Sequence, residues 1–300
     1  DGGGTRFIYD QSGNTSFGRF GPKNMSDLPE AKLTGDGMRR TKTPLWGKQP
    51  EQRSSYDAVL IGGGLHNLAT AYFLAKEQGM SNVAILERKF IGYGGAGRNT
   101  AIVRANQRTQ ENVPLYKEAL DLWPVLTREL DFNLMFNNCG NVNLMHSEAA
   151  MKAARTNIST AQFLGVESHL LDAKQTKELV PALSLSQDIT HPIHGAMYHP
   201  PGGVVRHDAV VWGLAKGAAR QGVHILQQTE AQDIVTQGGK VTGVQTSRGF
   251  ISTPRVLVSA GGYSAGIISS MLGITLPISV LTIQAMVTQP LKPLLDHVVS

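Results

Sequence analysis

The chain has 300 residues and 41% hydrophobic content, enough for a sizeable core in one large domain or two interleaved ones. Its formal net charge of +5 comes from scattered Arg and Lys residues, which gives nucleic-acid binding little support. No apolar run reaches the roughly 18 residues that a membrane span needs, and the first residues lack the pattern of a secretory signal.

The first strong structural signals follow a long polar stretch. Residues 1–55 are rich in Gly, Pro, Lys, Ser and Asn and predict an extended N-terminal arm. Next, "YDAVLI" predicts a strand, "LHNLATAYFLAKEQG" a helix that ends at Gly79, and "NVAILE" a second strand. This order is a βαβ unit, which implies a parallel sheet with a right-handed crossover.

The middle of the chain reads as mostly helical. Residues 113–131, 147–163 and 172–180 predict helices, whereas "MFNNCGNVNLMH" predicts a hairpin. The proline-rich stretch "HPIHGAMYHP" predicts a rigid loop. We expect no metal site, because the spacing of its histidines suits no common motif and no cysteine is near them. These histidines are His191, His194 and His199.

A helix is expected after the Arg-His-Asp triplet at 206–208, ending near Gly222. The strand-like runs "VHILQQ", "AQDIVTQ", "KVTGVQTSRG" and "RVLVSAGG" follow, the last as a buried strand. Trp123 and Trp212 lie on predicted helices and are expected in the core. The single cysteine, Cys139, is interpreted as a buried or turn residue. It cannot form an intrachain disulfide, which is compatible with a reducing compartment, and we expect a cytoplasmic protein.

These elements predict a mixed α/β and α+β fold in which one chain crosses repeatedly between two domains. A Rossmann-like FAD-binding domain is expected at residues 56–110 and 201–265. A mixed-sheet substrate domain is expected at residues 111–200 and 266–300, and to be incomplete at its C-terminal side.

The stretch "VLIGGGLHNLATA" holds most of a dinucleotide fingerprint. Gly62 would make the tight turn after the strand, and Gly64 would let the backbone approach a pyrophosphate at the helix N-terminus. The third glycine position holds Asn67, so the helix is expected to pack more loosely or in a shifted position. Glu87 closes the second strand, where a carboxylate accepts hydrogen bonds from ribose hydroxyls and repels a 2′-phosphate. The alternative is a tight turn without a ligand. His66 lies inside this turn and has no chemical role that we can argue.

Two further glycine-rich segments favour FAD over NAD, because their backbone can lie along a long, flat cofactor. The first is "RKFIGYGGAGRNT", directly after Glu87, and the second is "RVLVSAGGYS". The residues that we expect to contact FAD in these segments are Gly95, Arg98, Asn99, Thr100, Gly261 and Gly262.

The motifs "DAVLIGGG", "VAILER", "GRNTAIVR", "GGVVRHDAVVWG" and "TSRGFI" resemble those of the β subunits of heterotetrameric sarcosine oxidases. These proteins are flavin-dependent amine oxidoreductases with a glutathione-reductase-like FAD domain. The resemblance covers residues from about 56 to the end, and relatives continue past position 300.

The resemblance implies a two-flavin subunit. FAD would be bound non-covalently and accept a hydride from the N-methyl group of sarcosine or a similar small amine. FMN would be attached covalently to His207, with Arg206 in its vicinity, and pass electrons to oxygen to give hydrogen peroxide. Arg104, in "AIVR", would hold the substrate carboxylate. Other subunits of the hetero-oligomeric oxidase would bind NAD, folate and zinc.

Two rival functions remain open. One is a dehydrogenase of dimethylglycine, proline or another secondary amino acid, and the other is a non-catalytic FAD-binding scaffold subunit. Taken alone, Arg104 also fits a surface residue paired with an acid, and His207 fits a packing residue in a helix-capping loop.

Overall fold

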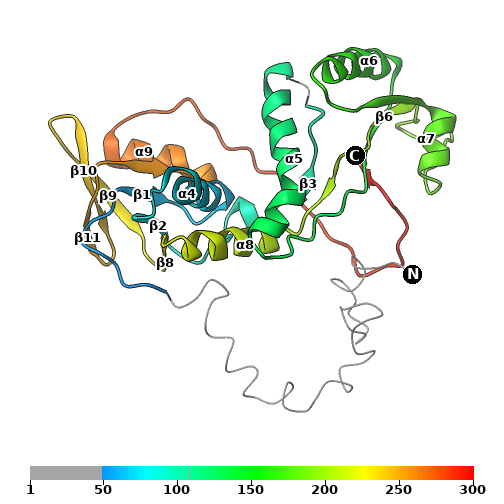
Figure 1. Ribbon diagram of the computed structural model, residues 1–300. Coiled ribbons are helices and arrows are strands. Elements are labelled where there is room, and N and C mark those ends of the chain that lie inside the picture. The colour runs from blue at the N-terminus through cyan, green and yellow to red at the C-terminus, as the bar shows by residue number, and fades with distance from the viewer. Residues whose placement is uncertain (1–48, 108) are drawn as a thin grey trace, which may run out of the picture.

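The computed structural model describes residues 49–107 and 109–300 and has two parts joined by a long helix (Figure 1). Most of the predicted N-terminal arm lies outside the described residues. The first part is built on a four-stranded sheet in the order β12-β1-β2-β8, with all neighbours parallel. Its strands are β1 (Ala58–Ile61), β2 (Val83–Glu87), β8 (His224–Gln227) and β12 (Val256–Val258).

Two helices cover one face of this sheet, α4 (Leu65–Gln78) and α8 (His207–Arg220). Alternate strand residues point to this face, so Leu60 and Ile85 pack against the helices in one hydrophobic cluster. Helix α4 ends at Gly79 as predicted, with the glycine in the left-handed conformation at φ 66°. The two helices and the sheet form the larger core of the chain.

A three-stranded antiparallel sheet in the order β11-β10-β9 covers the opposite face. Val59 and Ile61, which alternate with Leu60, pack there against Ile234 and Val244. Helix α9 adds partly buried residues to the same cluster. The elements are β9 (Ala231–Gln237), β10 (Lys240–Thr246), β11 (Gly249–Ser252) and α9 (Ser264–Leu272).

The second part contains a mixed four-stranded sheet in the order β13-β4-β6-β5 with two helices packed on it. Both helices begin at capping residues. Ser147 accepts a hydrogen bond from Ala150 N–H, and Asp172 forms a capping box with Gln175. The elements are β4 (Asn141–Met145), α6 (Glu148–Phe163), β5 (His169–Asp172), α7 (Ala173–Leu179), β6 (Gly195–His199) and β13 (Val298–Val299).

Helix α5 (Val113–Glu129) stands between the two parts (Figure 1). Trp123 on this helix packs against the core of the first part. It also packs against a smaller cluster that includes Val113 and Leu120 of the same helix. A short antiparallel ribbon also links the parts. Its strands are β3 (Ile102–Val103) and β7 (Gly203–Val204), and the remaining short helices are η4 (Gly95–Gly97), η5 (Gln110–Asn112) and η6 (Gly261–Tyr263).

Most predicted elements are confirmed, including the βαβ unit, the four long helices and the antiparallel meander. The predicted hairpin at 135–146 is wrong. Strand β4 pairs with β6, more than fifty residues later, while Asn137 bridges to Val204. The predicted rigid loop is also wrong, because "GAMYH" forms β6 in the centre of the second sheet. Its flanking prolines lie outside the paired residues, where a missing N–H costs no ladder bond.

Two burial predictions also differ from the structure. The sequence predicts a buried strand at β12, but β12 forms the edge of the parallel sheet, and Leu257 is 40% exposed. Trp212 is 38% exposed on α8, so it is not a core residue. The predicted fold class is confirmed as a Rossmann-like unit interleaved with a mixed-sheet unit. The domain boundaries stay a prediction.

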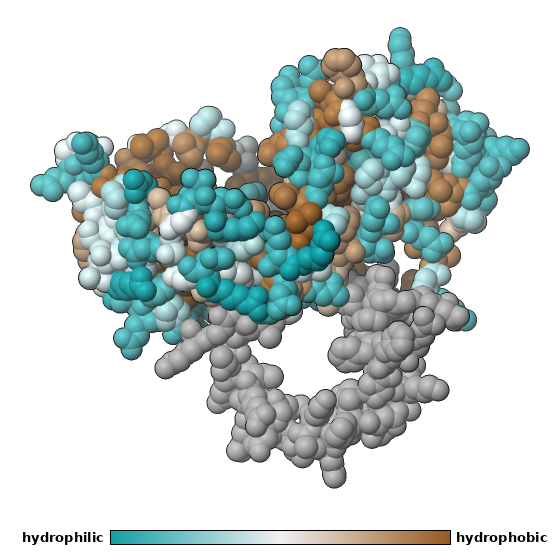
Figure 2. Space-filling view, viewed as in Figure 1, coloured by the Kyte–Doolittle hydropathy of each residue, from teal (hydrophilic) through white to brown (hydrophobic). Residues whose placement is uncertain are grey.

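After α9 the chain runs in an extended path without regular structure until β13. Figure 2 shows hydrophobic residues gathered on the surface over α9. The segment that follows is rich in exposed apolar side chains, including Leu281, Ile283, Met286 and Val287. Within the described part of the chain, no element covers these side chains.

No helix among the described residues is both long and apolar enough to cross a membrane.

The close approach of α8 to its neighbours depends on Gly217, and we predict that Gly217→Ala destabilises the fold. An added Cβ would lie 2.5 Å from Leu130 Cδ2 and 3.1 Å from the Tyr72 ring. Both neighbours are buried, so overpacking should cost about 1–3 kcal/mol. Urea unfolding measures this change. Gly266→Ala in α9 is the matched control, because its Cβ would meet nothing within 4 Å and should be neutral or slightly stabilising. Equal stability of the two variants would contradict the prediction.

Candidate functional site

The carboxyl ends of β1, β2 and β12 meet at one edge of the parallel sheet. Register places Ile61 beside both Leu86 and Val258, so the residues that follow these strands are neighbours. Gly62 leaves β1 with φ +112°, and an added Cβ would lie only 2.7 Å from the Ser259 carbonyl oxygen. This turn therefore requires glycine for both its backbone conformation and its close approach.

Helix α4 begins directly after this turn. Gly64 is its N-cap, and an added Cβ there would meet nothing within 4 Å. The first turn of α4 has no acidic residue, so the free N–H groups and the helix dipole leave this position attractive to an anion. The space next to Gly64 at the N-terminus of α4 is therefore open, and we call it the open cradle. His66 is exposed in the same first turn.

Glu87 ends β2, and its carboxylate faces the turn. Gly63 N–H donates to Oε2 at 2.9 Å, and Lys89 N–H donates to Oε1 at 2.8 Å. These bonds hold the carboxylate in one orientation next to the glycines. A carboxylate has about four lone-pair positions, so each oxygen can accept a further hydrogen bond from a ligand hydroxyl.

The structure corrects the expectation for Asn67. This residue is fully buried, and its Nδ2 donates to the carbonyl oxygens of Ile61 and Gly62 at 2.9 and 2.8 Å. The side chain therefore ties the helix to the turn rather than loosening the contact between helix and strand. Asn67 shares the buried face of α4 with the apolar residues Leu68 and Ala71. A polar residue on an otherwise apolar helix face was the signal in the sequence for such a role.

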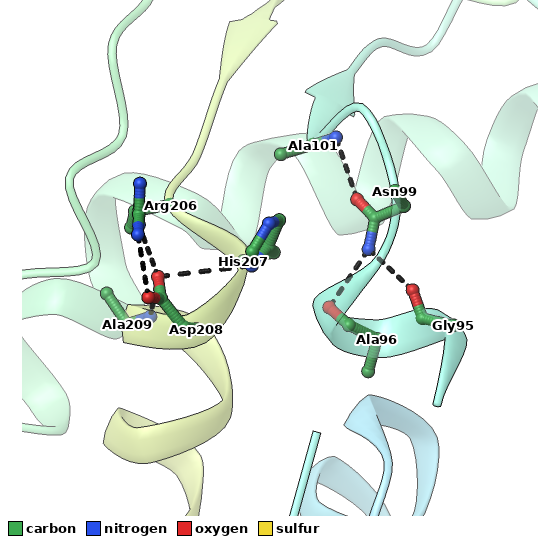
Figure 3. Close-up of polar contacts among 8 residues, drawn as sticks. All are labelled: Gly95, Ala96, Asn99, Ala101, Arg206, His207, Asp208 and Ala209. Atoms are coloured by element: carbon green, nitrogen blue, oxygen red, sulfur yellow. Dashed lines mark hydrogen bonds and ion pairs between the residues drawn. The ribbon is translucent and has the colours of Figure 1, made fainter. Parts of the chain in front are cut away.

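The glycine-rich loop between Ile91 and Ala101 packs on the same turn. Gly92 N–H donates to the Gly63 carbonyl oxygen at 2.9 Å. Asn99 folds back on its own loop: Nδ2 donates to the carbonyls of Gly95 and Ala96, and Oδ1 accepts from Ala101 N–H (Figure 3).

The side chains at the tip of this loop face outward. Arg98 donates to the Gly94 carbonyl oxygen and lies 5.1 Å from the centre of the Tyr93 ring. Gly95 and Thr100 are exposed. The loop is thus shaped largely by its own hydrogen bonds.

The corner after β12 lies against the Gly62 turn. Gly261 has φ +60°, and an added Cβ would meet nothing within 4 Å, whereas one on Gly262 would contact Val280 at 3.2 Å. Ser264 Oγ accepts from Ala260 N–H at 2.9 Å and holds the corner. The structure therefore brings Gly62, Gly64, Glu87 and Gly261 to one edge of the sheet.

The β3/β7 ribbon positions the other two candidate residues, Arg104 and His207. Ile102 pairs with Val204 and Val103 with Gly203, and Val205 N–H donates to the Ala101 carbonyl oxygen at 3.0 Å. Because the strands run in opposite directions, the residues after β3 and the residues after β7 lie at opposite ends of the ribbon. The structure thus places Arg104 at one end and His207 at the other.

His207 opens α8 beside the loop of Asn99 (Figure 3). Its side chain is 28% exposed, and its buried Nδ1 has no hydrogen-bond partner. Asp208 Oδ1 lies 3.9 Å from this nitrogen. The ring is therefore held at a helix start without a strong polar contact among the described residues.

Arg206 and Asp208 form a bidentate pair beside His207. Arg206 Nε and one terminal nitrogen lie 2.5 and 2.9 Å from the two carboxylate oxygens. Burial acts to raise the pKa of Asp208, but the Arg206 guanidinium outweighs it and the pKa lies below its usual value. The negative charge of Asp208 is thus matched by Arg206 rather than by His207.

Arg104 is half-buried directly after β3. Within residues 49–107 and 109–300, no carboxylate lies within ion-pair distance of its guanidinium. The alternative of an acid-paired surface arginine therefore has no support from these residues.

Two further residues received no role from the sequence. Gln227 Oε1 accepts from Ile91 N–H at 2.9 Å and holds the start of the glycine-rich loop, and His199 is fully buried close to Arg104. Burial raises the pKa of the Cys139 thiol, which disfavours the thiolate form of a nucleophile. Across the described ranges, no group of three or more His, Cys, Asp or Glu residues could hold a metal ion.

The parallel sheet, its glycine turn and the carboxylate at the end of β2 define a Rossmann-like dinucleotide-binding protein. Residues 57–299 match the family model described as FAD dependent oxidoreductase, and the chain belongs to this family.

Among individual proteins, the chain is similar to two sarcosine oxidase β subunits. The chain is 41% identical over 268 residues to sarcosine oxidase subunit beta of Rhizobium meliloti (strain 1021), covering 89% of this chain and 64% of that protein. It is 38% identical over 255 residues to sarcosine oxidase subunit beta of Arthrobacter sp., covering 85% and 62%. The chain thus spans somewhat less than two thirds of the length of these relatives.

Solved structures share the fold. L-proline dehydrogenase from P. horikoshii is 27% identical with a TM-score of 0.67, over 74% of this chain and 57% of that one. L-amino acid deaminase from Proteus myxofaciens is 28% identical with a TM-score of 0.68, over 76% and 50%.

We predict that Gly64→Val weakens FAD binding by about tenfold or more, a change of at least 1.4 kcal/mol. The branched side chain would fill the open cradle at the start of α4, where an anion would approach. Because nothing in the described protein occupies that position, thermal unfolding of the apoprotein should change little. Gly64→Ala adds only Cβ and should have a smaller effect. Flavin absorbance per protein after gel filtration measures occupancy, and full occupancy of Gly64→Val would show that the cofactor is held elsewhere.

Proposed function

We propose that this chain is the FAD-binding subunit of an oxidase that acts on sarcosine or a similar small secondary amine. The similarity to two sarcosine oxidase β subunits over 85% and 89% of this chain carries the proposal. The family match supports a flavin as the redox cofactor. The amine and the oxidase activity are inferred from relatives that are longer than this chain.

The residues at the carboxyl edge of the parallel sheet fit FAD. Gly62 and Gly64 would admit the pyrophosphate to the start of α4, and Glu87 would accept a hydrogen bond from a ribose hydroxyl. The backbone of two glycine-rich segments would extend the site beyond the nucleotide, with Gly95, Arg98, Asn99, Thr100, Gly261 and Gly262 as the proposed contacts. When bound, FAD supplies an acceptor for a hydride.

Arg104 would bind the substrate carboxylate. A guanidinium holds a carboxylate bidentately, and no carboxylate of the described residues competes for this one. Fixing the carboxylate limits the positions of the N-methyl group, so orientation contributes to catalysis. No strong catalytic base is assigned, because oxidation of a neutral amine does not require one.

His207 would carry FMN through a covalent bond, with Arg206 nearby. The buried Nδ1 supports Nε2 as the nitrogen that is available for attachment. We further propose that electrons leave through this FMN to oxygen and that hydrogen peroxide is the product. Other subunits of a heterotetramer would complete the enzyme and hold any NAD, folate or zinc.

A dehydrogenase acting on proline, dimethylglycine or another secondary amino acid is the second candidate. Similarity to an L-proline dehydrogenase favours it. Anaerobic addition of sarcosine should bleach the flavin spectrum if the chain is catalytic, whereas a scaffold subunit would show no bleaching. Oxygen consumption with peroxide release then separates an oxidase from a dehydrogenase.

The role of Arg104 predicts that Arg104→Ala weakens sarcosine binding while FAD stays bound. Loss of a hydrogen-bonded charge pair costs about 1.5–3 kcal/mol, which is about a ten- to hundredfold rise in KM. Steady-state kinetics measures this rise, with flavin absorbance as the control for FAD content. A KM equal to that of the wild type would assign Arg104 to structure.

The role of His207 predicts that a peptide spanning this residue carries the mass of FMN. Mass spectrometry of the denatured subunit, assembled with its partner subunits, tests this. His207→Asn should abolish the added mass and leave FAD in place, because the Gly62 turn and the start of α4, which would bind the FAD pyrophosphate, are unchanged in this variant. His66→Asn is the matched control, since His66 is an exposed histidine at the start of α4 and should leave the FMN mass unchanged. An unmodified His207 peptide from a fully active complex would disprove the attachment.

A further inference from the structure

His199 is a fully buried histidine at the end of β6, and both of its ring nitrogens are hydrogen-bonded. Nδ1 lies 2.6 Å from the Glu167 carbonyl oxygen, and Ala105 N–H donates to Nε2 at 3.2 Å. A carbonyl can only accept and an amide N–H can only donate, so the ring must carry its proton on Nδ1. The contacts therefore select the neutral ring and a single tautomer.

The hydrogen bond to His199 Nε2 comes from Ala105, the residue that directly follows Arg104 in the chain. On the other side of Arg104, Val103 pairs with Gly203 in the β3/β7 ribbon. The backbone of Arg104 is thus held on its N-terminal side by the ribbon and on its C-terminal side by His199. Ala105 itself is fully buried, so its N–H has no water to replace a lost partner.

The histidine is itself fixed from several directions. Asn141 lies opposite it in the β4/β6 register, and Gly202 is so close that an added Cβ would lie 3.1 Å from His199 Cδ2. The chain turns at Gly202, whose N–H donates to the His199 carbonyl oxygen, and then enters β7. The same few residues therefore link the second sheet to the ribbon that carries Arg104.

We propose that His199 is a positioning residue that sets the orientation of Arg104 through the Ala105 N–H. The inference rests on the proposed role of Arg104 in binding a substrate carboxylate. His199 does not touch the substrate in this scheme. It holds the backbone so that the guanidinium meets the carboxylate in one geometry, and loss of the bond would allow the Arg104 segment to move.

Burial and the charges around the ring together favour the neutral form of His199. Burial lowers the pKa of His199 from its usual value, the neighbouring Arg104 lowers it further, and the Glu167 backbone and side chain act in the opposite direction. A proton added to Nε2 would face the Ala105 N–H, donor against donor. Acid would therefore break the contact, and because the pKa is lowered, this occurs at a lower pH than for an ordinary histidine.

Two variants separate the two contacts of the ring. The amide of His199→Asn ends near the position of Nδ1, so it can keep the bond to Glu167 but loses Ala105. The longer His199→Gln can present an acceptor to Ala105 N–H. We expect His199→Asn to raise KM for sarcosine about five- to tenfold, the effect of one hydrogen bond, with a smaller change in kcat. His199→Gln should restore KM toward the wild-type value.

His169→Gln is the matched control. His169 is an exposed histidine on the neighbouring strand that also contacts Glu167, through its side-chain carboxylate at 3.0 Å, but it does not contact Ala105. Its KM should equal that of the wild type. If His199→Asn also leaves KM unchanged, or if His199→Gln raises it as much as His199→Asn does, the positioning role is wrong.

A double-mutant cycle with Arg104→Ala tests whether His199 acts through Arg104. Binding of methoxyacetate, which has the shape of sarcosine without its amine, is followed by flavin absorbance in the FAD-containing protein. His199→Asn should weaken binding in the wild type and have little effect once Arg104 is removed. Equal weakening in both backgrounds overturns the inference. If Arg104→Ala alone leaves methoxyacetate binding unchanged, the proposed substrate role of Arg104 fails first.

Nitrogen-15 NMR of the wild type tests the geometry without a substitution. The His199 ring should be neutral at pH 7, with its proton on Nδ1 and an unprotonated Nε2. A proton on Nε2 would rule out the bond from Ala105 and the inference with it, even if no His199 variant folds.

Discussion

The chain leaves β1 through a turn in which Gly62 lies so close to the Ser259 carbonyl that any Cβ would overlap it. This constraint follows from the parallel pairing of β1 with both β2 and β12, which brings three strand ends to one edge. It leads into α4, which packs on one face of the sheet and has its N-terminus open at Gly64. It also brings the Glu87 carboxylate within hydrogen-bonding distance of the Gly63 N–H. The geometry of the proposed nucleotide site depends on this single turn.

The β3/β7 ribbon has the equivalent role for the rest of the site. It joins the parallel sheet to the mixed sheet and is only two residues long on each side. Its two ends place Arg104 toward His199 and His207 toward the glycine-rich loop. The roles proposed for Arg104 and His207, substrate binding and flavin attachment, would thus lie at opposite ends of one ribbon.

The apolar side chains of the segment after α9 are exposed, whereas those of the two cores are buried. Leu281, Ile283 and Met286 each expose more than four fifths of their surface within the described chain. Exposed apolar surface of this extent usually marks a face that another element covers. The relatives of this chain are longer than the part that it matches. The exposed segment lies within residues 266–300, which the sequence predicts to belong to the substrate domain.

Local signals in the sequence are sufficient for the βαβ unit. The run "DAVLI", the glycines that follow it and the amphipathic helix ending at Gly79 each specify their structure through nearest neighbours. Periodicity predicts the helices α5 to α8 in the same way, and Ser147 and Asp172 cap two of them. The glycine fingerprint and Glu87 can therefore be located from the order of the residues alone.

Tertiary contacts decided the rest, since they join residues that are distant in the chain. Strand β4 pairs with β6 rather than with the residues just before it, because the pairing partner of a strand depends on the whole sheet. The sequence suggested a loop around His199 because its prolines are local signals, whereas its hydrogen bonds reach Glu167 and Ala105, 32 and 94 residues away. Asn67 likewise read as a departure from the glycine pattern, and only the folded turn places two carbonyl oxygens around its amide. The sequence by itself thus determined which segments form the nucleotide-binding unit. The tertiary structure decided which buried polar groups hold the site together, because a buried hydrogen bond depends on a partner that periodicity cannot identify.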